Sequence, residues 1–261
     1  MTAQLGQAAL SYEHMFLLYR RTWRGSIFNS FLSPVLFLLA MGIGLGTFID
    51  DQGAAALGVP YLQFLAPGLL ASTVMQTAAF ESTFPIIGGM VWVKRYHAMH
   101  ATPLRPADIA LGQLGWIATR ITLVATIFVA VMVAFGAARS PLVVLAIPVA
   151  ALTGMAFSAP IAAFAATQDR MDKFNAIFRF GITPLFLFSG TFFPVEQLPI
   201  FVQPLAWITP LWHGVSLARG LSLGTIGEEP LLAIVHLAVL VAFVVGGTLW
   251  TLRSFRQRLV K

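Results

Sequence analysis

Few side chains in this sequence have the types and spacing needed for acid–base or metal chemistry. His97 and His100 are three residues apart, which can place two imidazoles on one metal ion, but no third ligand lies beside them in the sequence. General acid–base catalysis needs His, Asp or Glu gathered in one place. The apolar stretches contain no Asp, and neither an HExxH nor a GxSxG motif occurs. We therefore expect no catalytic site and no metal site.

A nucleotide-binding P-loop is excluded as well. Its Gly-Lys-Ser/Thr step lets the lysine reach the β- and γ-phosphates while the hydroxyl holds magnesium. The chain has three lysines (Lys94, Lys173 and Lys261), and none of them precedes Ser or Thr. We expect no cofactor in this chain, which cannot hydrolyse ATP through a Walker motif.

The composition is that of an integral membrane protein. Of the 261 residues, 58% are hydrophobic and 10% are charged, whereas soluble domains have about 25% charged residues. There is no cysteine, so disulfides and thiolate metal sites are impossible. A membrane-spanning helix needs roughly 20 mainly apolar residues. The fold class expected is all-α with six transmembrane helices, at about residues 26–48, 62–88, 112–136, 142–166, 174–193 and 231–252.

The basic residues predict how the chain is oriented. Cytoplasmic loops carry an excess of Lys and Arg, and six spans put both termini on one side. With both termini in the cytoplasm, only Arg139 and Arg219 lie outside. The other 14 of the 16 basic residues lie inside: Arg20, Arg21, Arg24, Lys94, Arg95, Arg105, Arg120, Arg170, Lys173, Arg179, Arg253, Arg256, Arg258 and Lys261. We expect a multi-pass plasma membrane protein with no cleaved signal peptide. The net charge of +6 does not by itself imply nucleic acid.

Residues 1–25 have the pattern of an amphipathic helix. Leu5, Ala9, Tyr12, Phe16, Tyr19 and Trp23 follow one another at spacings of four and three, which places them on one face. Arg20 and Arg24 lie off this stripe. The pattern favours a helix in the cytoplasmic membrane interface, with aromatic side chains in lipid and arginines at the headgroups. The alternative is a frayed basic tail.

A second amphipathic segment interrupts the apolar chain at 91–106. Trp92, Tyr96, Met99 and Pro103 repeat at four, three and four, with Lys94, Arg95 and His97 off that stripe. A short helix ended by "ATPLRP" fits, because a residue before proline is disfavoured in the helical region. An ordinary basic loop that fixes topology would explain the charge. It would not explain the stripe, which needs a partner protein or neighbouring helices to cover it.

Ionisable groups inside spans are expensive and mark functional or structural sites. Glu81 and Arg120 lie in antiparallel spans at comparable depth, and we expect an ion pair that stabilises helix packing rather than a transport role. His236 is expected to form a hydrogen bond with a neighbouring helix. The proline-rich segment 194–224 is too broken for a span and too apolar for a free loop, so it is either re-entrant or an amphipathic loop lying on lipid.

Three stretches carry a family resemblance. "KRYHAMHATPLRPADIALGQ" (Lys94–Gln113) resembles the cytoplasmic coupling segment of type-2 ABC exporter permeases. "FLFSGTFFPVEQLPIFVQPLAWITPLWHGVSLARGL" (Phe186–Leu221) is similar to the fifth span of that family and the turns after it. "YLQFLAPGLLASTVMQTAAFES" (Tyr61–Ser82) resembles the second span of its branch that exports nodulation lipo-oligosaccharides, to which daunorubicin-resistance permeases are related. Many members have a Glu-Gly-Thr-type sequence where this chain has Tyr96–Met99.

The resemblance implies a single ABC-2 transmembrane domain over 1–261. Its coupling helix at 91–106 would dock on a separate ATPase subunit that binds ATP and magnesium. The implied docking residues are Trp92, Lys94, Arg95, Tyr96, His97, Met99, Thr102, Pro103, Leu104 and Arg105. The outer re-entrant helices would cap the exit path through Phe193, Pro194, Pro199, Trp207, Pro210 and Trp212. The implied partners are the ATPase, a second permease subunit in a homodimer or heterodimer, and membrane lipid, but no nucleic acid.

These features predict the membrane subunit of an ATP-driven exporter. Its substrate would be amphiphilic: a lipid-linked oligosaccharide, a glycolipid or a hydrophobic drug. A secondary transporter is the alternative, but such carriers show inverted repeats and intramembrane acids. This chain shows no repeat and offers only Glu81. A membrane enzyme is a third possibility, and it lacks a catalytic cluster.

Overall fold

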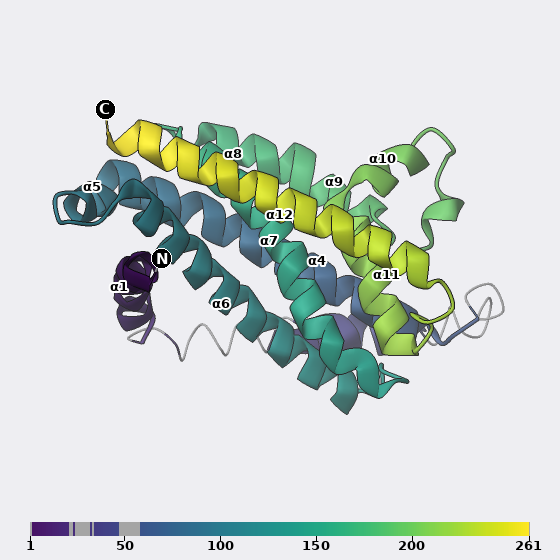
Figure 1. Cartoon of the computed structure of the whole chain (residues 1–261). Coiled ribbons are helices and arrows are strands. Elements are labelled where there is room, and N and C mark those ends of the chain that lie inside the picture. Colours follow the sequence, from purple (N-terminus) through teal and green to yellow (C-terminus); the bar gives the residue numbers. More distant parts are fainter. Residues whose placement is uncertain (1, 21–22, 24–31, 33, 47–57, 261) are drawn as a thin grey trace.

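The computed structural model describes residues 2–20, 23, 32, 34–46 and 58–260 (Figure 1). Every regular element in these ranges is a helix, so the all-α class is confirmed for this part of the chain. Much of the predicted first span (26–48) lies outside the described residues, and so does Arg24. The described part of that span contains the π-helix η1 (Leu38–Leu45), which packs against α4.

Three described helices are long and apolar enough to cross a membrane: Pro106–Ala134, Pro141–Ala166 and Pro230–Leu259. They correspond to α6 (Pro106–Ala134), to the 3-10 turn η3 (Pro141–Leu145) with α7 (Ala146–Ala166), and to α12 (Pro230–Leu259). The helix α4 (Tyr61–Ile87) covers the predicted second span. Its 27 residues give about 40 Å, which exceeds the roughly 30 Å hydrocarbon thickness. The structure thus supports three of the six predicted spans by length and composition.

The predicted fifth span is a composite helix. It begins as α8 (Asp172–Ile177), continues as the π-helix η4 (Phe178–Ile182) and ends as α9 (Thr183–Phe188). The helix stops at the turn through Gly190, whose φ of 80° suits a residue without a Cβ atom. Beyond it come η5 (Val195–Gln197), α10 (Gln203–Ile208) and α11 (Pro210–Leu223), which occupy the predicted re-entrant segment.

The predicted helix over 91–106 is much shorter in the structure. After α4 the chain continues as the π-helix η2 (Gly88–Trp92), and α5 spans only Arg95–His100. Lys94 separates the two with a φ of 51°, in the left-handed region that non-glycine residues seldom adopt. Arg105 is extended ahead of Pro106, and its backbone N–H donates to the Asp108 carboxylate at 3.1 Å where α6 begins.

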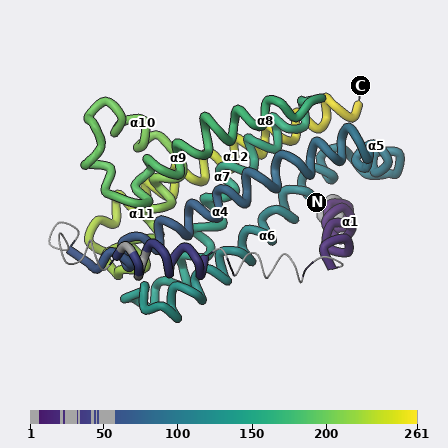
Figure 2. The backbone as a smooth tube through the Cα atoms, turned by 180° about the vertical axis from the view of Figure 1, so that it is seen from behind, coloured from purple at the N-terminus to yellow at the C-terminus, as the bar shows by residue number. Residues whose placement is uncertain are grey.

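The long helices run side by side with α7 in the middle (Figures 1 and 2). α4, α6, α11 and α12 all pack against α7, whose buried face consists largely of Ala, Gly, Ser and Thr. Small residues let helix backbones approach closely. α1 (Thr2–Tyr19), α5 and the C-terminal part of α12 lie together at one end, called here the α5 end. α10 and the first turns of α12 lie at the opposite, α10 end. The two termini therefore share one end, as an even number of spans requires.

A half-buried arginine, Arg219, holds three elements together at the α10 end. The Arg219 guanidinium donates to the backbone oxygen of Phe64 from Nε and Nη2 at 3.2 Å, and to that of Gly190 from Nη2 at 2.8 Å. It also lies 3.8 Å from the centre of the Phe64 ring. One side chain of α11 thus joins the first turn of α4 to the turn after α9. The sequence places Arg219 on the outer side of the membrane; in the structure its side chain is half-buried and bound to the backbone of α4.

Replacing Arg219 with Met should lower the free energy of unfolding by about 2–3 kcal/mol, because two buried carbonyls lose charged donors. Arg219→Lys should recover part of this loss. Arg139→Met is the matched control, since Arg139 is exposed and exposed sites change stability within about 0.5 kcal/mol. Thermal unfolding of the purified protein in detergent measures the effect. Equal losses from Arg219→Met and Arg139→Met would contradict it.

Candidate functional site

Tyr96 anchors α5 to the body of the protein. Its side chain is fully buried, and its hydroxyl donates to Gln113 Oε1 in α6 at 2.9 Å. The ring meets Phe255 of α12 edge to face, with centroids 5.5 Å apart. Gly89 makes room for it, because a Cβ atom at that position would lie 2.5 Å from the Tyr96 ring. A six-residue helix is therefore held against both α6 and α12.

Burial raises the pKa of the Tyr96 phenol, and the neighbouring Arg95 guanidinium opposes part of that shift. Arg95 Nη2 donates to the Tyr96 hydroxyl at 3.2 Å. The phenol is therefore protonated near neutral pH and can donate to Gln113. The anchor is a neutral hydrogen bond inside apolar surroundings, where an unmade bond is costly.

The predicted docking residues fall into three groups in the structure. The exposed ones are Trp92, Lys94, His97, Thr102, Pro103 and Arg105, and Trp92 has 61% of its surface accessible. Arg95, Met99 and Leu104 are half-buried, and Tyr96 is buried. A partner protein cannot touch the Tyr96 side chain in this structure. The predicted stripe is divided because Lys94 breaks the helix, so Trp92 and Tyr96 do not share one helical face.

α1 packs across α6 next to this segment. The buried Ser11 lies against Gly112, where a Cβ atom would come within 2.5 Å of the Ser11 Cβ atom. Ser11 Oγ also lies 4.0 Å from Met99 Sδ, so α1 touches the half-buried side of the docking segment. The docking segment therefore contacts α1 as well as α6 and α12, and it cannot move without disturbing these contacts.

The aromatic stripe of α1 is divided between protein and surface. Tyr12 and Tyr19 pack against Trp116 of α6, with ring centroids 6.1 and 5.3 Å away. Phe16 and Trp23 are exposed, by 47% and 43%, and Arg20 is exposed beyond the last turn of α1. Two residues of the predicted lipid-facing stripe, Tyr12 and Tyr19, thus contact the protein itself.

Arg120 and Glu81 meet within the bundle. Arg120 Nε lies 3.3 Å from Glu81 Oε1, and their side chains are 11% and 18% exposed. Arg120 Nη1 donates to the Tyr19 hydroxyl at 2.8 Å, and the guanidinium lies 4.5 Å from the Tyr19 ring centre. The cluster joins α1, α4 and α6. This geometry suits a role in helix packing, because Glu81 and Arg120 are paired with each other and Arg120 also binds Tyr19.

Two histidines form a contact that sequence reasoning missed. His213 Nδ1 and His236 Nδ1 are 2.6 Å apart, and both side chains are buried. Trp212 packs edge to face against both rings. His236 was expected to bond to a neighbouring helix. Nothing in the local sequence indicates His213 as the partner, because it lies on α11 across a loop.

The predicted exit-region residues lie at the α10 end. Pro199 and Trp207 are exposed, Phe193, Pro194 and Trp212 are half-buried, and Pro210 is buried at the start of α11. Trp207 and Trp212 are neighbours, with ring centroids 6.4 Å apart. No group of three metal-binding side chains occurs among the described residues, and His97 is exposed on α5.

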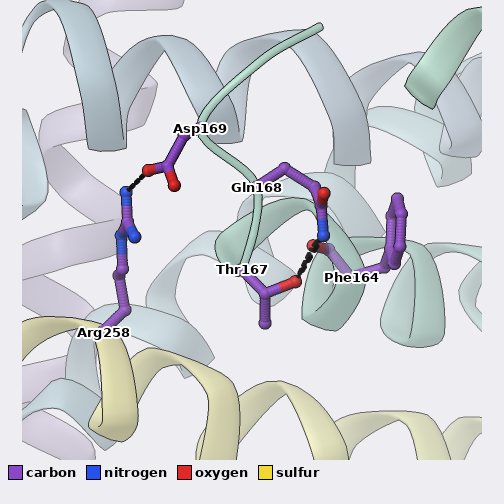
Figure 3. Close-up of polar contacts among 5 residues, drawn as sticks. All are labelled: Phe164, Thr167, Gln168, Asp169 and Arg258. Carbon is purple, nitrogen blue, oxygen red and sulfur yellow. Dashed lines mark hydrogen bonds and ion pairs between the residues drawn. The ribbon is translucent and has the colours of Figure 1, made fainter. Parts of the chain in front are cut away.

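An ion pair joins the α7–α8 turn to the last turns of α12 at the α5 end (Figure 3). Arg258 of α12 pairs with Asp169 of the α7–α8 turn. Gln168 Nε2 donates to Thr167 Oγ1 at 2.7 Å, which keeps that turn compact. The ion pair joins the α7–α8 turn to α12. Among the described arginines near the end of α12 (Arg253, Arg256 and Arg258), Arg258 is the one paired with a carboxylate.

These features define a class of protein: a multi-helix membrane protein with a short, anchored helix exposed at one end and no Walker A motif in its sequence. The chain belongs to the ABC-2 type transporter family, whose model matches residues 7–223. It is therefore the membrane subunit of an ATP-binding-cassette transporter, and the family implies pairing with a nucleotide-binding ATPase subunit.

Curated relatives extend over nearly the whole chain. Nodulation protein J of Rhizobium leguminosarum bv. viciae is 32% identical over 94% of this chain and 92% of its own length. Nodulation protein J of Sinorhizobium fredii is 31% identical over 94% and 91%. The inner membrane transport permease YadH of Escherichia coli is 24% identical over 87% and 86%.

Removing the Tyr96 hydroxyl should loosen α5. In Tyr96→Phe the buried Gln113 acceptor loses its donor, and the free energy of unfolding should fall by about 1–3 kcal/mol. Because the folded-state pKa is raised, the wild-type contribution is complete below pH 10 and is lost as the pH rises beyond it. Thermal unfolding at pH 8 and above pH 10 should show that the wild type loses this stability at the higher pH, whereas Tyr96→Phe does not show this loss.

Tyr12→Phe is the control for this experiment, since its hydroxyl contact with Thr119 is exposed. It should change stability by less than about 0.5 kcal/mol. A Tyr96→Phe protein as stable as Tyr12→Phe would show that the Gln113 bond does not hold α5.

The Glu81–Arg120 pair should behave as one unit. Glu81→Leu leaves Arg120 without its carboxylate and should cost about 3 kcal/mol, whereas Glu81→Leu with Arg120→Met should cost less than the single change. A double-mutant cycle by thermal unfolding measures the coupling. Additivity within about 0.5 kcal/mol would contradict it.

Proposed function

We propose that this chain is the permease of an exporter that moves an amphiphile outward across the plasma membrane, which is the inner membrane in a bacterium. The cargo class is a lipid-linked oligosaccharide, a glycolipid or a hydrophobic drug. ATP and magnesium are bound by a separate ATPase. The observation that carries the proposal is the state of α5, which is exposed on one side and anchored through Tyr96 on the other.

The ATPase docks on the exposed residues of this segment, with Trp92 and His97 at the centre. Closure of two ATPases on nucleotide pushes α5. Because Tyr96 ties α5 to α6 and α12, the push reaches the spans and favours the outward-open state. A flexible loop would absorb the same displacement.

The proposed arrangement has six spans, with both termini and the α5 end in the cytoplasm. Two copies, identical or different, form the path between them. α1 lies in the cytoplasmic interface with Phe16 and Trp23 in lipid, and the re-entrant helices α10 and α11 cap the outer exit. The 14 basic residues predicted inside support this orientation. So does the grouping of α1, α5 and the end of α12 at one end of the bundle.

The cargo assignment has two supports. Tyr61–Ser82 resembles the second span of nodulation lipo-oligosaccharide exporters, and the relatives over most of the chain are named nodulation protein J. A path through spans with so few charged residues also suits an amphiphile better than an ion.

The docking face gives the direct test. Trp92→Asp with His97→Asp should reduce the amount of Walker-motif ATPase that co-purifies with the tagged chain from its native membranes at least tenfold. The cause is the loss of an exposed aromatic anchor of the interface. Quantitative mass spectrometry measures the ATPase, and the complex in proteoliposomes is assayed for ATP-dependent flipping of a fluorescent glycolipid.

Ile200→Asp is the matched control, because Ile200 is 83% exposed at the α10 end. It should leave ATPase recovery unchanged. If no ATPase accompanies even the wild type after crosslinking, the exporter mechanism fails. If the ATPase is retained by the double variant, α5 is not the docking site.

A further inference from the structure

A cavity at the α5 end shares only one residue, Arg105, with the proposed docking segment. It lies between the start of α6 and the last turns of α12 and has a volume of about 590 Å³, within the roughly 300–1,000 Å³ of small-molecule sites. Its lining consists of Arg105, Pro106, Ala107, Leu252, Arg253, Arg256 and Val260. Three arginines thus line one cavity together with four apolar or small residues.

The three arginines of this cavity are free to bind an anion. No ion pair joins Arg105, Arg253 or Arg256 to a carboxylate in the part of the chain that the structure describes, and the lining contains no Asp or Glu. Arg258, five residues beyond Arg253 on α12, is already paired with Asp169 (Figure 3). The unpaired charges are therefore gathered at the cavity rather than spread along the helix end.

The position of the cavity relates it to the membrane. The apolar part of α12 ends at Leu252, so Arg253 is the first charged residue past the hydrocarbon zone. Only 17% of the apolar window of α12 is buried inside the protein, so this helix turns most of its surface outward. A phosphate at the cavity would lie at the depth of lipid headgroups.

An exposed apolar stripe leads away from the cavity. Val241, Val245 and Leu249 follow each other at intervals of four and continue to Arg253, so all four lie along one side of α12. They are 43%, 53% and 62% exposed. A phosphate held by the arginines would have its acyl chains beside this stripe. A soluble phosphate would make no use of it.

We propose that this cavity is a binding site for an anionic phospholipid, with the headgroup phosphate held by Arg105, Arg253 and Arg256 and the acyl chains along Val241, Val245 and Leu249. Guanidinium groups pair with phosphate through two parallel hydrogen bonds. Charges that only fix topology need not converge on a cavity or adjoin an apolar stripe. The site shares Arg105 with the proposed docking segment but includes no residue of α5, so Arg253 and Arg256 test it separately from ATPase docking.

The experiment measures lipid retention by the purified full-length chain in detergent, using native mass spectrometry and a competition assay. Phosphatidylglycerol should bind in preference to phosphatidylcholine. Arg253→Gln or Arg256→Gln should each weaken phosphatidylglycerol binding about fivefold, as expected for one arginine near an anionic headgroup. Arg258→Gln, with the same change of charge on the same helix end, should leave binding unchanged. Leu249→Gln should weaken binding of the lipid.

Soluble glycerol 3-phosphate, added at the same concentration, should not displace the lipid. Full displacement would show a free-phosphate site and overturn the lipid assignment. Equal binding of phosphatidylcholine, or equal losses with Arg258→Gln and Arg253→Gln, would overturn the proposal. Size-exclusion chromatography checks that each variant is folded. Arg253→Lys with Arg256→Lys, which keeps the charges, should retain phosphatidylglycerol binding and so separates loss of charge from loss of structure.

Discussion

The hydrogen bond from the Tyr96 hydroxyl to Gln113 is the contact on which the coupling end of the molecule depends. α5 is six residues long, far too short to be stable by itself. Its position comes from one buried aromatic side chain that fits over Gly89 and meets both α6 and α12. In the proposed mechanism, this attachment is what transmits a displacement of α5 to α6 and α12.

Polar side-chain contacts also hold helices together elsewhere in the bundle. Apolar helices gain little from one another's side chains in lipid, so polar contacts and close packing decide how they associate. Arg219 joins α11 to α4, Arg120 joins α6 to α4 and α1, and His213 joins α11 to α12. Each of these side chains has hydrogen-bond partners on other elements of the protein, so together they fix the arrangement of the helices.

The α5 end combines two surfaces with different chemistry. The docking face, with Trp92 and His97, is exposed beside α1 and suits a protein partner. The cavity with Arg253 and Arg256 lies at the end of the apolar part of α12 and suits a lipid phosphate. Both adjoin Arg105 and the start of α6. A lipid at the cavity would therefore lie next to the segment on which the ATPase is proposed to dock.

The sequence alone determined the membrane class, the lack of a Walker motif and the family. These rest on local composition and on motifs that can be read along the chain. It also brought Glu81 and Arg120 together by depth. Only the tertiary structure decided that Tyr96 points inward while Trp92 stays exposed, that Arg219 binds the backbone of Phe64 and Gly190, and that His236 meets His213. The physical reason is that these outcomes depend on a single left-handed residue at Lys94 and on partners distant in sequence, which no helical period encodes.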